Sequence, residues 1–146
     1  MDPVCRHAAR LLVIDPDNSV LLFQYEDDRR TWWAAPGGGL ERGETFEQAA
    51  AREAAEELAL KLTTFTPLWC QTVDFTFRGQ SIHQVERYFL VRVSRKDVGL
   101  GDVVGEAHRL EGIVAARWWS LREIETTSEQ VFPEHLHERL CSLQRP

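Results

Sequence analysis

Three glutamates near the middle of the chain have the spacing of one face of a helix. Glu53, Glu56 and Glu57 stand at positions i, i+3 and i+4, which lie side by side on an α-helix. Two carboxylates about 4 Å apart repel each other by roughly 1 kcal/mol in water and about 4 kcal/mol near a protein surface. Cations offset this repulsion, and hard divalent ions, Mg²⁺ first, prefer oxygen ligands. The spacing therefore predicts a metal-binding stripe.

The glycine-rich turn before these residues supports the metal interpretation. Gly37, Gly38 and Gly39 permit positive φ and close approach of the backbone, and the carbonyl of Gly38 could itself ligate a metal. The alternative is a solvated acidic face. Such a face usually alternates Glu with Lys, whereas the one basic residue beside these glutamates is Arg52. We therefore favour the metal site.

A helix must position these carboxylates. Thr45 predicts its N-cap, and Gln48, three residues later, would complete a capping box. The face opposite the glutamates carries small apolar residues at the spacing i, i+3, i+4 and i+7, so we expect that face to be buried. Its residues are Ala51, Ala54, Ala55 and Leu58.

The segment 38–60 resembles the Nudix box. That pattern is a glycine, five residues, a glutamate, seven residues and then R-E-U-x-E-E-x-G-U, where U is bulky and apolar. The matching residues are Gly38, Glu44, Arg52, Glu53, Ala54, Glu56, Glu57 and Leu60. Ala59 stands where the family usually has glycine, the common left-handed residue at a helix end, and Ala54 stands where a larger aliphatic residue is usual.

The resemblance implies hydrolysis of a diphosphate bond in a nucleoside diphosphate linked to another group. The metal, Mg²⁺ or Mn²⁺, would neutralise the diphosphate and acidify a water molecule, and a carboxylate would take the proton. The implied metal ligands are Gly38, Glu53, Glu56 and Glu57. Arg52 would orient Glu53 through a charge-assisted hydrogen bond. Glu44 would brace the loop, touch a metal through water, or act as a charge at the helix N-terminus.

The resemblance leaves the general base open between a box glutamate and a residue of a later loop. The later loop here is Ser94–Gly112, and loops of this length are usually functional or disordered. Among its acidic residues Glu111 lies nearest the final strand, beside a glycine that permits a sharp approach. A solvated charge is the alternative. The expected catalytic residues are Glu53, Arg52 and Glu111.

Three residues outside the box are candidates for substrate binding. Arg29 lies in a charged loop shortly before the glycine turn and could reach a phosphate, although charge runs are usually solvated. Trp33 and Trp118 could stack on a base, although large aromatic residues more often belong to the core.

Apolar runs predict the strands around the helix. Arg6–Ile14 and Val20–Tyr25 are separated by a strong turn, and we expect them to pair as a hairpin of buried strands. Further strands are expected within Leu62–Phe77, Ile82–Val93 and Ala115–Trp119. Pro133 predicts the first residue of a terminal helix that reaches about Cys141. The fold class is α+β. The resemblance implies a single domain over residues 1–146, with a mixed β-sheet between helices in an α/β/α sandwich.

Length, composition and charge limit the classes of protein to which this chain can belong. With 146 residues, 43% hydrophobic and 27% charged, the chain suits a soluble globular domain. A net charge of −6 argues against a nucleic-acid surface, but not against a nucleotide, because bound metal supplies positive charge. Three widely separated cysteines fit a reducing cytoplasm. Neither a signal peptide nor a membrane span is expected. A homodimer is left open.

Three functions compete on these residues. A metal-dependent diphosphate hydrolase is favoured over a nucleotide-sensing module, which would be expected to lose box carboxylates or to add a DNA-binding domain. A diphosphate isomerase would need an activated cysteine beside the metal. The family's markers for ADP-ribose, diadenosine-polyphosphate and coenzyme A substrates are absent. Nucleoside triphosphates and nucleotide sugars remain, and we favour a nucleoside triphosphate pyrophosphohydrolase.

Overall fold

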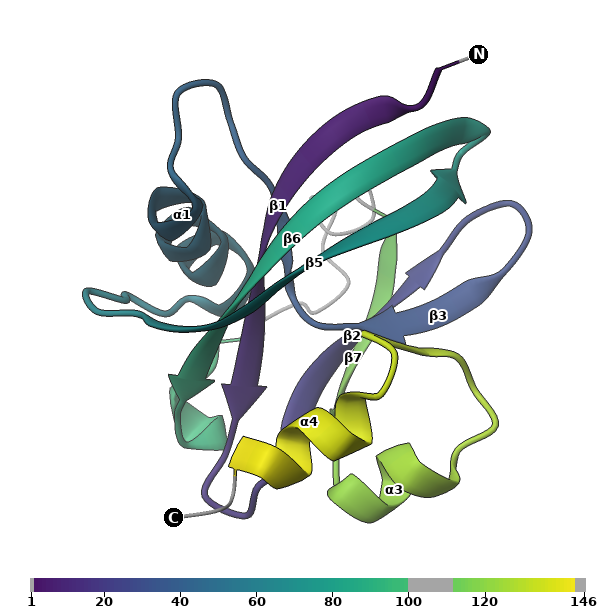
Figure 1. Cartoon of the computed structure of the whole chain (residues 1–146). Helices are drawn as coiled ribbons and strands as arrows, with labels where there is room; N and C mark the ends of the chain where they lie inside the picture. The colour runs from purple at the N-terminus through teal and green to yellow at the C-terminus, as the bar shows by residue number, and fades with distance from the viewer. Residues whose placement is uncertain (1, 100–111, 144–146) are drawn as a thin grey trace.

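A curved mixed β-sheet with helices on both sides forms the molecule (Figure 1). The computed structural model describes residues 2–99 and 112–143. The strands are β1 Val4–Ile14, β2 Val20–Glu26, β3 Thr31–Ala34, β4 Gly37–Gly39, β5 Thr66–Phe77, β6 Gln80–Arg92, β7 Ile113–Trp119 and β8 Val131–Phe132. The helices are α1 Phe46–Leu58, α3 Leu121–Thr126 and α4 Leu136–Leu143, with a single 3₁₀ turn, η1, at Arg95–Asp97. The expected α+β class is confirmed.

Strand β1 lies at the centre of the sheet, whose order is β5-β6-β1-β2-β3-β8. It pairs in parallel with β6 along its whole length, from Val4 opposite Ile82 to Ile14 opposite Arg92. The expected β1–β2 hairpin is therefore wrong in its main pairing. The two strands meet only where Ile14 faces Val20. A continuous apolar run is typical of a strand covered on both faces, but it does not specify the neighbour.

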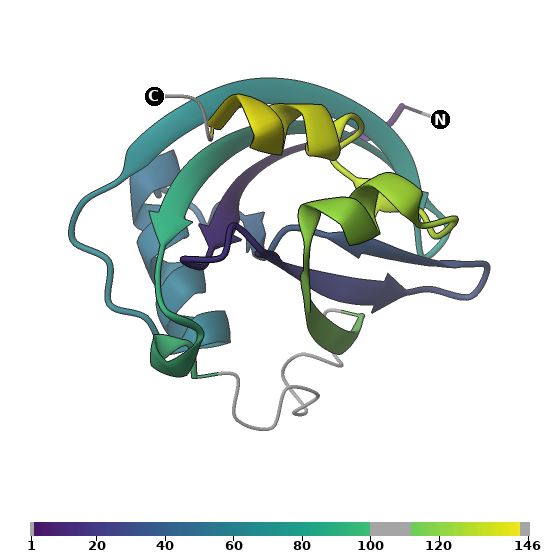
Figure 2. The ribbon, with the colours of Figure 1, turned by 90° about the horizontal axis from the view of Figure 1, so that it is seen from below.

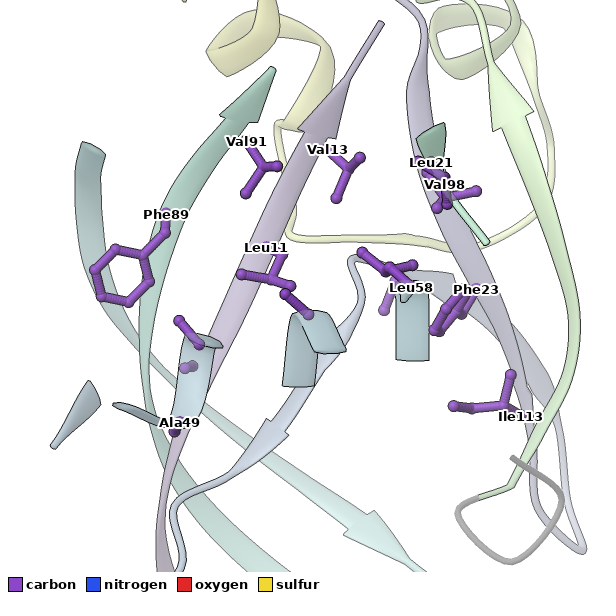
Figure 3. Close-up of a cluster of buried hydrophobic side chains, with 14 of the residues drawn as sticks. Leu11, Val13, Leu21, Phe23, Ala49, Leu58, Phe89, Val91, Val98 and Ile113 are labelled. Atoms are coloured by element: carbon purple, nitrogen blue, oxygen red, sulfur yellow. The ribbon is translucent and has the colours of Figure 1, made fainter. Parts of the chain in front are cut away.

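Two cores fill the two faces of the sheet, because successive residues of a strand point to opposite sides. Leu11 and Val13 pack towards α1 in the core of Figure 3. Leu12 and Ile14 pack towards α3 and α4 on the other face. Figure 2 shows α3 and α4 side by side. The sheet therefore lies between helical layers, as expected.

Helix α1 begins as expected, and its buried face matches the predicted face only in part. Thr45 and Gln48 form the reciprocal capping box. The buried residues of α1 are Ala49, Ala50, Glu53, Ala54, Glu57 and Leu58, whereas Ala55 is exposed. The predicted buried face is therefore correct for Ala54 and Leu58 and wrong for Ala55, because the buried face is turned towards Glu53 and Glu57. Two carboxylates share the buried face with the alanines, which costs free energy unless they are compensated.

Two helix termini differ from the usual pattern: the C-terminal end of α1 and the beginning of α4. Ala59 ends α1 in the left-handed conformation with φ 54°, the role that glycine has in the Nudix box. The terminal helix begins at Leu136 rather than Pro133. Phe132 still pairs with β3 as part of β8, so the chain leaves the sheet just before the proline and turns through His135 before becoming helical.

Candidate active site

A wide cleft of about 1350 Å³ opens between the β2–β3 hairpin and the β5–β6 hairpin. The turns of both hairpins lie on the same side of the molecule, at the right of Figure 1. The glycine strand β4 and the buried edge of α1 also line this cleft, through Gly38 and Glu53. Strand β4 is held beside β1, with Gly38 opposite Ala9. The fold therefore brings the box helix and both hairpin loops to one cavity.

The Glu53 carboxylate is pressed against the glycine turn. Its side chain is 4% exposed, and its Oε1 accepts a hydrogen bond from Arg52 Nη1 at 3.0 Å. Its Oε2 is buried and accepts no hydrogen bond from any group in the described ranges. A Cβ on Gly38 would lie 2.5 Å from Oε1, so only glycine leaves room for this carboxylate. A buried carboxylate oxygen that accepts no hydrogen bond is expected of a side chain that binds a cation.

Arg52 connects the helix to the loop that precedes it. Its guanidinium donates to both oxygens of Glu44, to the Gly39 carbonyl and to Glu53. The Arg52 hydrogen bonds hold the pKa of Glu44 below its usual range. The same bonds to Glu44, followed by the charge of Glu53, raise the pKa of Arg52. Glu44 also accepts from the Glu41 amide at 2.8 Å. Of the three roles considered for Glu44, the geometry matches bracing the loop.

The other two glutamates of the predicted metal-binding stripe, Glu56 and Glu57, differ in their exposure to solvent. Glu56 is half-exposed and lies 3.4 Å from Arg52 Nη1, while Glu57 is buried on the sheet-facing side of α1. Within residues 2–99 and 112–143, no three His, Cys, Asp or Glu side chains converge tightly enough to enclose an ion. The donor set is nonetheless all oxygen, and the buried Oε2 of Glu53 lies against the Gly38 backbone. These residues fit a hard divalent cation, provided that Glu56 turns away from Arg52.

The aromatic candidates are placed differently from the sequence-based expectation. Trp33 is 6% exposed, packs edge-to-face on Trp119, and donates from Nε1 to Glu129. It belongs to the core, so the structure does not support stacking on a base. Trp118 is half-buried beneath Arg95 and does not line the cleft. Among the described tryptophans it is Trp32 that lines the cleft, beside the aromatic rings of Tyr25 and Phe77.

From the sequence, Trp33 was chosen instead of its neighbour Trp32. Moving by one residue along a strand moves the side chain to the other face of the sheet, so only one of the two can face the cleft. Trp32 and Trp33 are consecutive in β3, so their side chains point to opposite faces. Trp32 stacks on Tyr25 at a ring-centroid distance of 5.8 Å, and the Arg30 guanidinium lies 4.9 Å from its ring. Arg29 also lines the cleft, from the exposed β2–β3 loop. Glu111 lies outside the described residues.

A buried polar cluster that was not expected from the sequence also lines the cleft. Glu86 of β6 accepts hydrogen bonds from Arg10 Nε at 3.2 Å and from the Tyr88 hydroxyl at 3.3 Å. Burial lowers the pKa of Arg10, but the charges of Tyr25 and Glu86 outweigh burial, and the pKa is raised overall. Burial, and then Glu86, raise the pKa of Tyr88. Arg10 and Glu86 thus form a largely buried ion pair at the wall of the cleft.

Known proteins resemble this chain over most of its length. A model of the NUDIX domain matches residues 5–140. This chain belongs to the NUDIX family. A protein named Nucleoside triphosphatase NudI, from Escherichia coli O139:H28 (strain E24377A / ETEC), is 36% identical over 84 residues, which cover 54% of this chain and 59% of NudI. An RNA pyrophosphohydrolase of Pelagibacter ubique (strain HTCC1062) is 34% identical over 56 residues, 38% of this chain and 35% of that protein.

Solved structures of NUDIX proteins share the fold. A mutT/nudix family protein from Listeria innocua superposes with a TM-score of 0.67 and 19% identity, covering 98% of this chain and 95% of that one. The MutT protein from Methanosarcina mazei Go1 gives a TM-score of 0.65 and 19% identity, covering 97% and 94%. Nudix hydrolases generally use divalent metal ions. No described helix is long and apolar enough to cross a membrane.

Proposed function

We propose that this Nudix protein is a divalent metal-dependent pyrophosphohydrolase that acts on nucleoside triphosphates, with Mg²⁺ or Mn²⁺ as the metal. The Glu53 carboxylate carries the proposal. It is buried between Arg52 and the Gly38 backbone at a wide cleft, and one of its oxygens accepts no hydrogen bond from any described group. A buried charge in this state destabilises the fold, and a cation bound there offsets the cost.

Each box residue has a distinct task under this proposal. Glu53, Glu56 and Glu57 hold the metal together with the Gly38 carbonyl. When bound, the metal neutralises the diphosphate and acidifies a water molecule. Arg52 fixes the Glu53 carboxylate through the hydrogen bond of 3.0 Å. Either Glu53 or Glu111 takes the proton from the water.

The substrate is oriented along the cleft. The diphosphate lies over the glycine turn, where backbone and metal meet it, and Arg29 reaches a phosphate from the β2–β3 loop. The base lies towards Trp32, which together with Tyr25 and Phe77 forms an aromatic surface in the cleft. The name of NudI, a nucleoside triphosphatase, supports triphosphates over nucleotide sugars as the substrate class.

A substrate panel with product identification tests the proposal. ATP, GTP, CTP, UTP, UDP-glucose and an RNA with a 5′-triphosphate would each be incubated with Mg²⁺, Mn²⁺ or EDTA, and the products separated by ion-exchange chromatography. We expect nucleoside monophosphate and pyrophosphate from at least one triphosphate, and no turnover in EDTA. Full activity in EDTA would remove the metal site. Tight binding of a triphosphate by calorimetry without turnover would favour a sensing module instead.

A further inference from the structure

The buried polar cluster in the cleft contains one carboxylate, Glu86, whose acceptor sites are occupied by donors of the protein itself. Glu86 accepts four hydrogen bonds. Arg10 Nε donates at 3.2 Å and Gln84 Nε2 at 2.8 Å to one oxygen, and Gln71 Nε2 at 3.0 Å and the Tyr88 hydroxyl at 3.3 Å to the other. With this many donors, Glu86 orients its neighbours rather than offering an acceptor to a ligand.

Gln84 is left with an acceptor that nothing in the described structure uses. The residue is 1% exposed, lines the cleft, and its Oε1 accepts no hydrogen bond from any described group. The orientation of its amide is fixed, because only the nitrogen can lie 2.8 Å from a carboxylate oxygen of Glu86. A buried carbonyl that accepts no hydrogen bond is unfavourable, so a donor from a ligand is stabilising here.

Arg10 places donors beside this acceptor. Arg10 and Gln84 donate to the same oxygen of Glu86, which holds the guanidinium and the amide next to each other. The Nη1 atom of Arg10 is used by the Tyr25 hydroxyl and the Ala35 carbonyl, whereas no described group accepts from its Nη2. A donor and an acceptor side by side match the edge of a nucleobase, which also presents an acceptor beside a donor.

The aromatic wall of the same cleft favours a planar ligand. Trp32 lines it, held by the Tyr25 ring at 5.8 Å with an interplanar angle of 12°. Stacking on an aromatic face stabilises any base, because every base has a π-face, and a phosphate has none. The cleft therefore combines a stacking surface with a fixed hydrogen-bonding pair.

We propose that Gln84 is a specificity-determining residue: its Oε1 accepts a hydrogen bond from the nucleobase of the substrate, while Arg10 donates to the adjacent acceptor of the same base edge. This inference rests on the proposed hydrolysis of nucleoside triphosphates and adds the base to what the site recognises. Glu86 acts as a positioning residue for both side chains.

Gln71 provides a matched control. Gln71 and Gln84 each donate one hydrogen bond to Glu86, but Oε1 of Gln71 already accepts from Trp69 Nε1 at 3.2 Å. Gln71→Met and Gln84→Met therefore weaken the support of Glu86 alike, and only Gln84→Met removes the acceptor offered to the base. The substrates to compare are the triphosphate with the highest kcat/KM and ribose 5-triphosphate, which has the same phosphates and no base.

The expected result is a base-dependent loss. Gln84→Met lowers kcat/KM for the nucleoside triphosphate about 10-fold, as the loss of one hydrogen bond predicts, and leaves ribose 5-triphosphate within about 2-fold of wild type. Gln71→Met changes both substrates equally. An equal change for both substrates in Gln84→Met would overturn the inference and leave Gln84 a structural support. If the wild-type protein hydrolyses neither substrate, the proposed function itself fails, which is a separate outcome.

A measurement on the unaltered protein covers the case in which Gln84→Met does not fold. The side-chain amide signals of Gln84 in a ¹⁵N–¹H spectrum would be followed during titration with a non-hydrolysable nucleoside triphosphate or with ribose 5-triphosphate. We expect these signals to move with the nucleotide and not with the base-free compound. Equal movement, or none with either compound, would contradict the inference.

Discussion

Arg52 donates hydrogen bonds to both carboxylate oxygens of Glu44, from Nε at 2.7 Å and from Nη2 at 2.9 Å. Glu44 precedes the N-cap of α1 and Arg52 lies in the middle of the helix, so this pair ties the glycine loop to the helix that carries the box glutamates. The same guanidinium reaches Glu53 and the Gly39 carbonyl. One planar, five-donor side chain therefore sets the position of the loop and of the carboxylate together.

Replacing Arg52 with lysine should disrupt both functions of this side chain. A single ammonium cannot span Glu44, Glu53 and Gly39 at once, so Arg52→Lys should lower the free energy of unfolding by about 1–3 kcal/mol and lower kcat. Urea denaturation and steady-state kinetics measure the two effects. Arg42→Lys is the control, because Arg42 is exposed in the same loop. Equal behaviour of the two variants would contradict a special role for Arg52.

Neutralising the buried carboxylate should separate activity from stability. Glu53→Gln removes the charge that we assign to the metal, so kcat should fall at least about 100-fold, while the melting temperature in EDTA stays at or above that of wild type because a buried charge is lost. The rise in melting temperature on adding Mg²⁺ should also shrink. Glu56→Gln and Glu57→Gln should lower kcat by a similar factor.

The exposed Glu47, in the first turn of the same helix, gives the comparison for these variants. Glu47→Gln should leave kcat and the Mg²⁺-induced shift unchanged. Near-normal turnover in any one of the three box variants would remove that residue from the metal site.

Acid should release the clamp between Arg52 and Glu44. The pKa of Glu44 lies below its ordinary value of 4.5 in the folded protein, first through the hydrogen bonds from Arg52. A lowered folded pKa stabilises the fold above the unfolded value, and this contribution is lost as the pH falls through the folded value. The difference in unfolding free energy between wild type and Glu44→Gln should thus be constant above about pH 5 and vanish at lower pH. A difference independent of pH would exclude this linkage.

The alanine at the end of α1 is accommodated by a glycine elsewhere. A Cβ on Gly99 would lie 2.8 Å from the Cβ of Ala59, and the Gly99 amide donates to the Leu58 carbonyl at 2.8 Å. Gly99→Ala should destabilise the protein by about 1–3 kcal/mol through this contact. Ala59→Gly should stabilise it by about 0.5–1 kcal/mol, because the left-handed conformation costs alanine more than the added chain entropy of glycine.

A double-mutant cycle checks that the two positions act on each other. The cost of Gly99→Ala, measured by urea denaturation, should fall in the Ala59→Gly background, giving a coupling of at least about 0.5 kcal/mol. Additive effects of the two changes would mean that the contact does not decide which residue each position holds.

Local structure was predicted from the sequence more accurately than the packing of one segment against another. The capping box at Thr45 and the Arg52–Glu53 hydrogen bond follow from residues close in the chain, and both are observed. The buried side of α1 was assigned only partly correctly: Ala54 and Leu58 are buried as predicted, but Glu53 and Glu57 are buried with them, although acidic residues are normally exposed. Whether that face holds a metal stays a prediction.

The polar cluster around Glu86 was missed because its members come from strands far apart in the chain. A signal was present: Arg10 interrupts the apolar stretch of residues 8–14 in β1, and Gln84 and Glu86 alternate with residues of the other face of β6. A charge within a buried strand needs a buried partner. That rule would have indicated an acidic side chain near Arg10, but not which strand supplies it.

The parallel pairing of β1 with β6 has a consequence for the order in which the protein is made. Ala9 of β1 lies opposite Arg87 of β6, so a ribosome releases the central strand long before its principal neighbour exists. Closing so long a loop is entropically costly, and until then β1 carries an apolar run with an unpaired edge, the kind of segment that aggregates. Nascent chains halted before β6 emerges should therefore require chaperones, and chains halted beyond Arg92 much less.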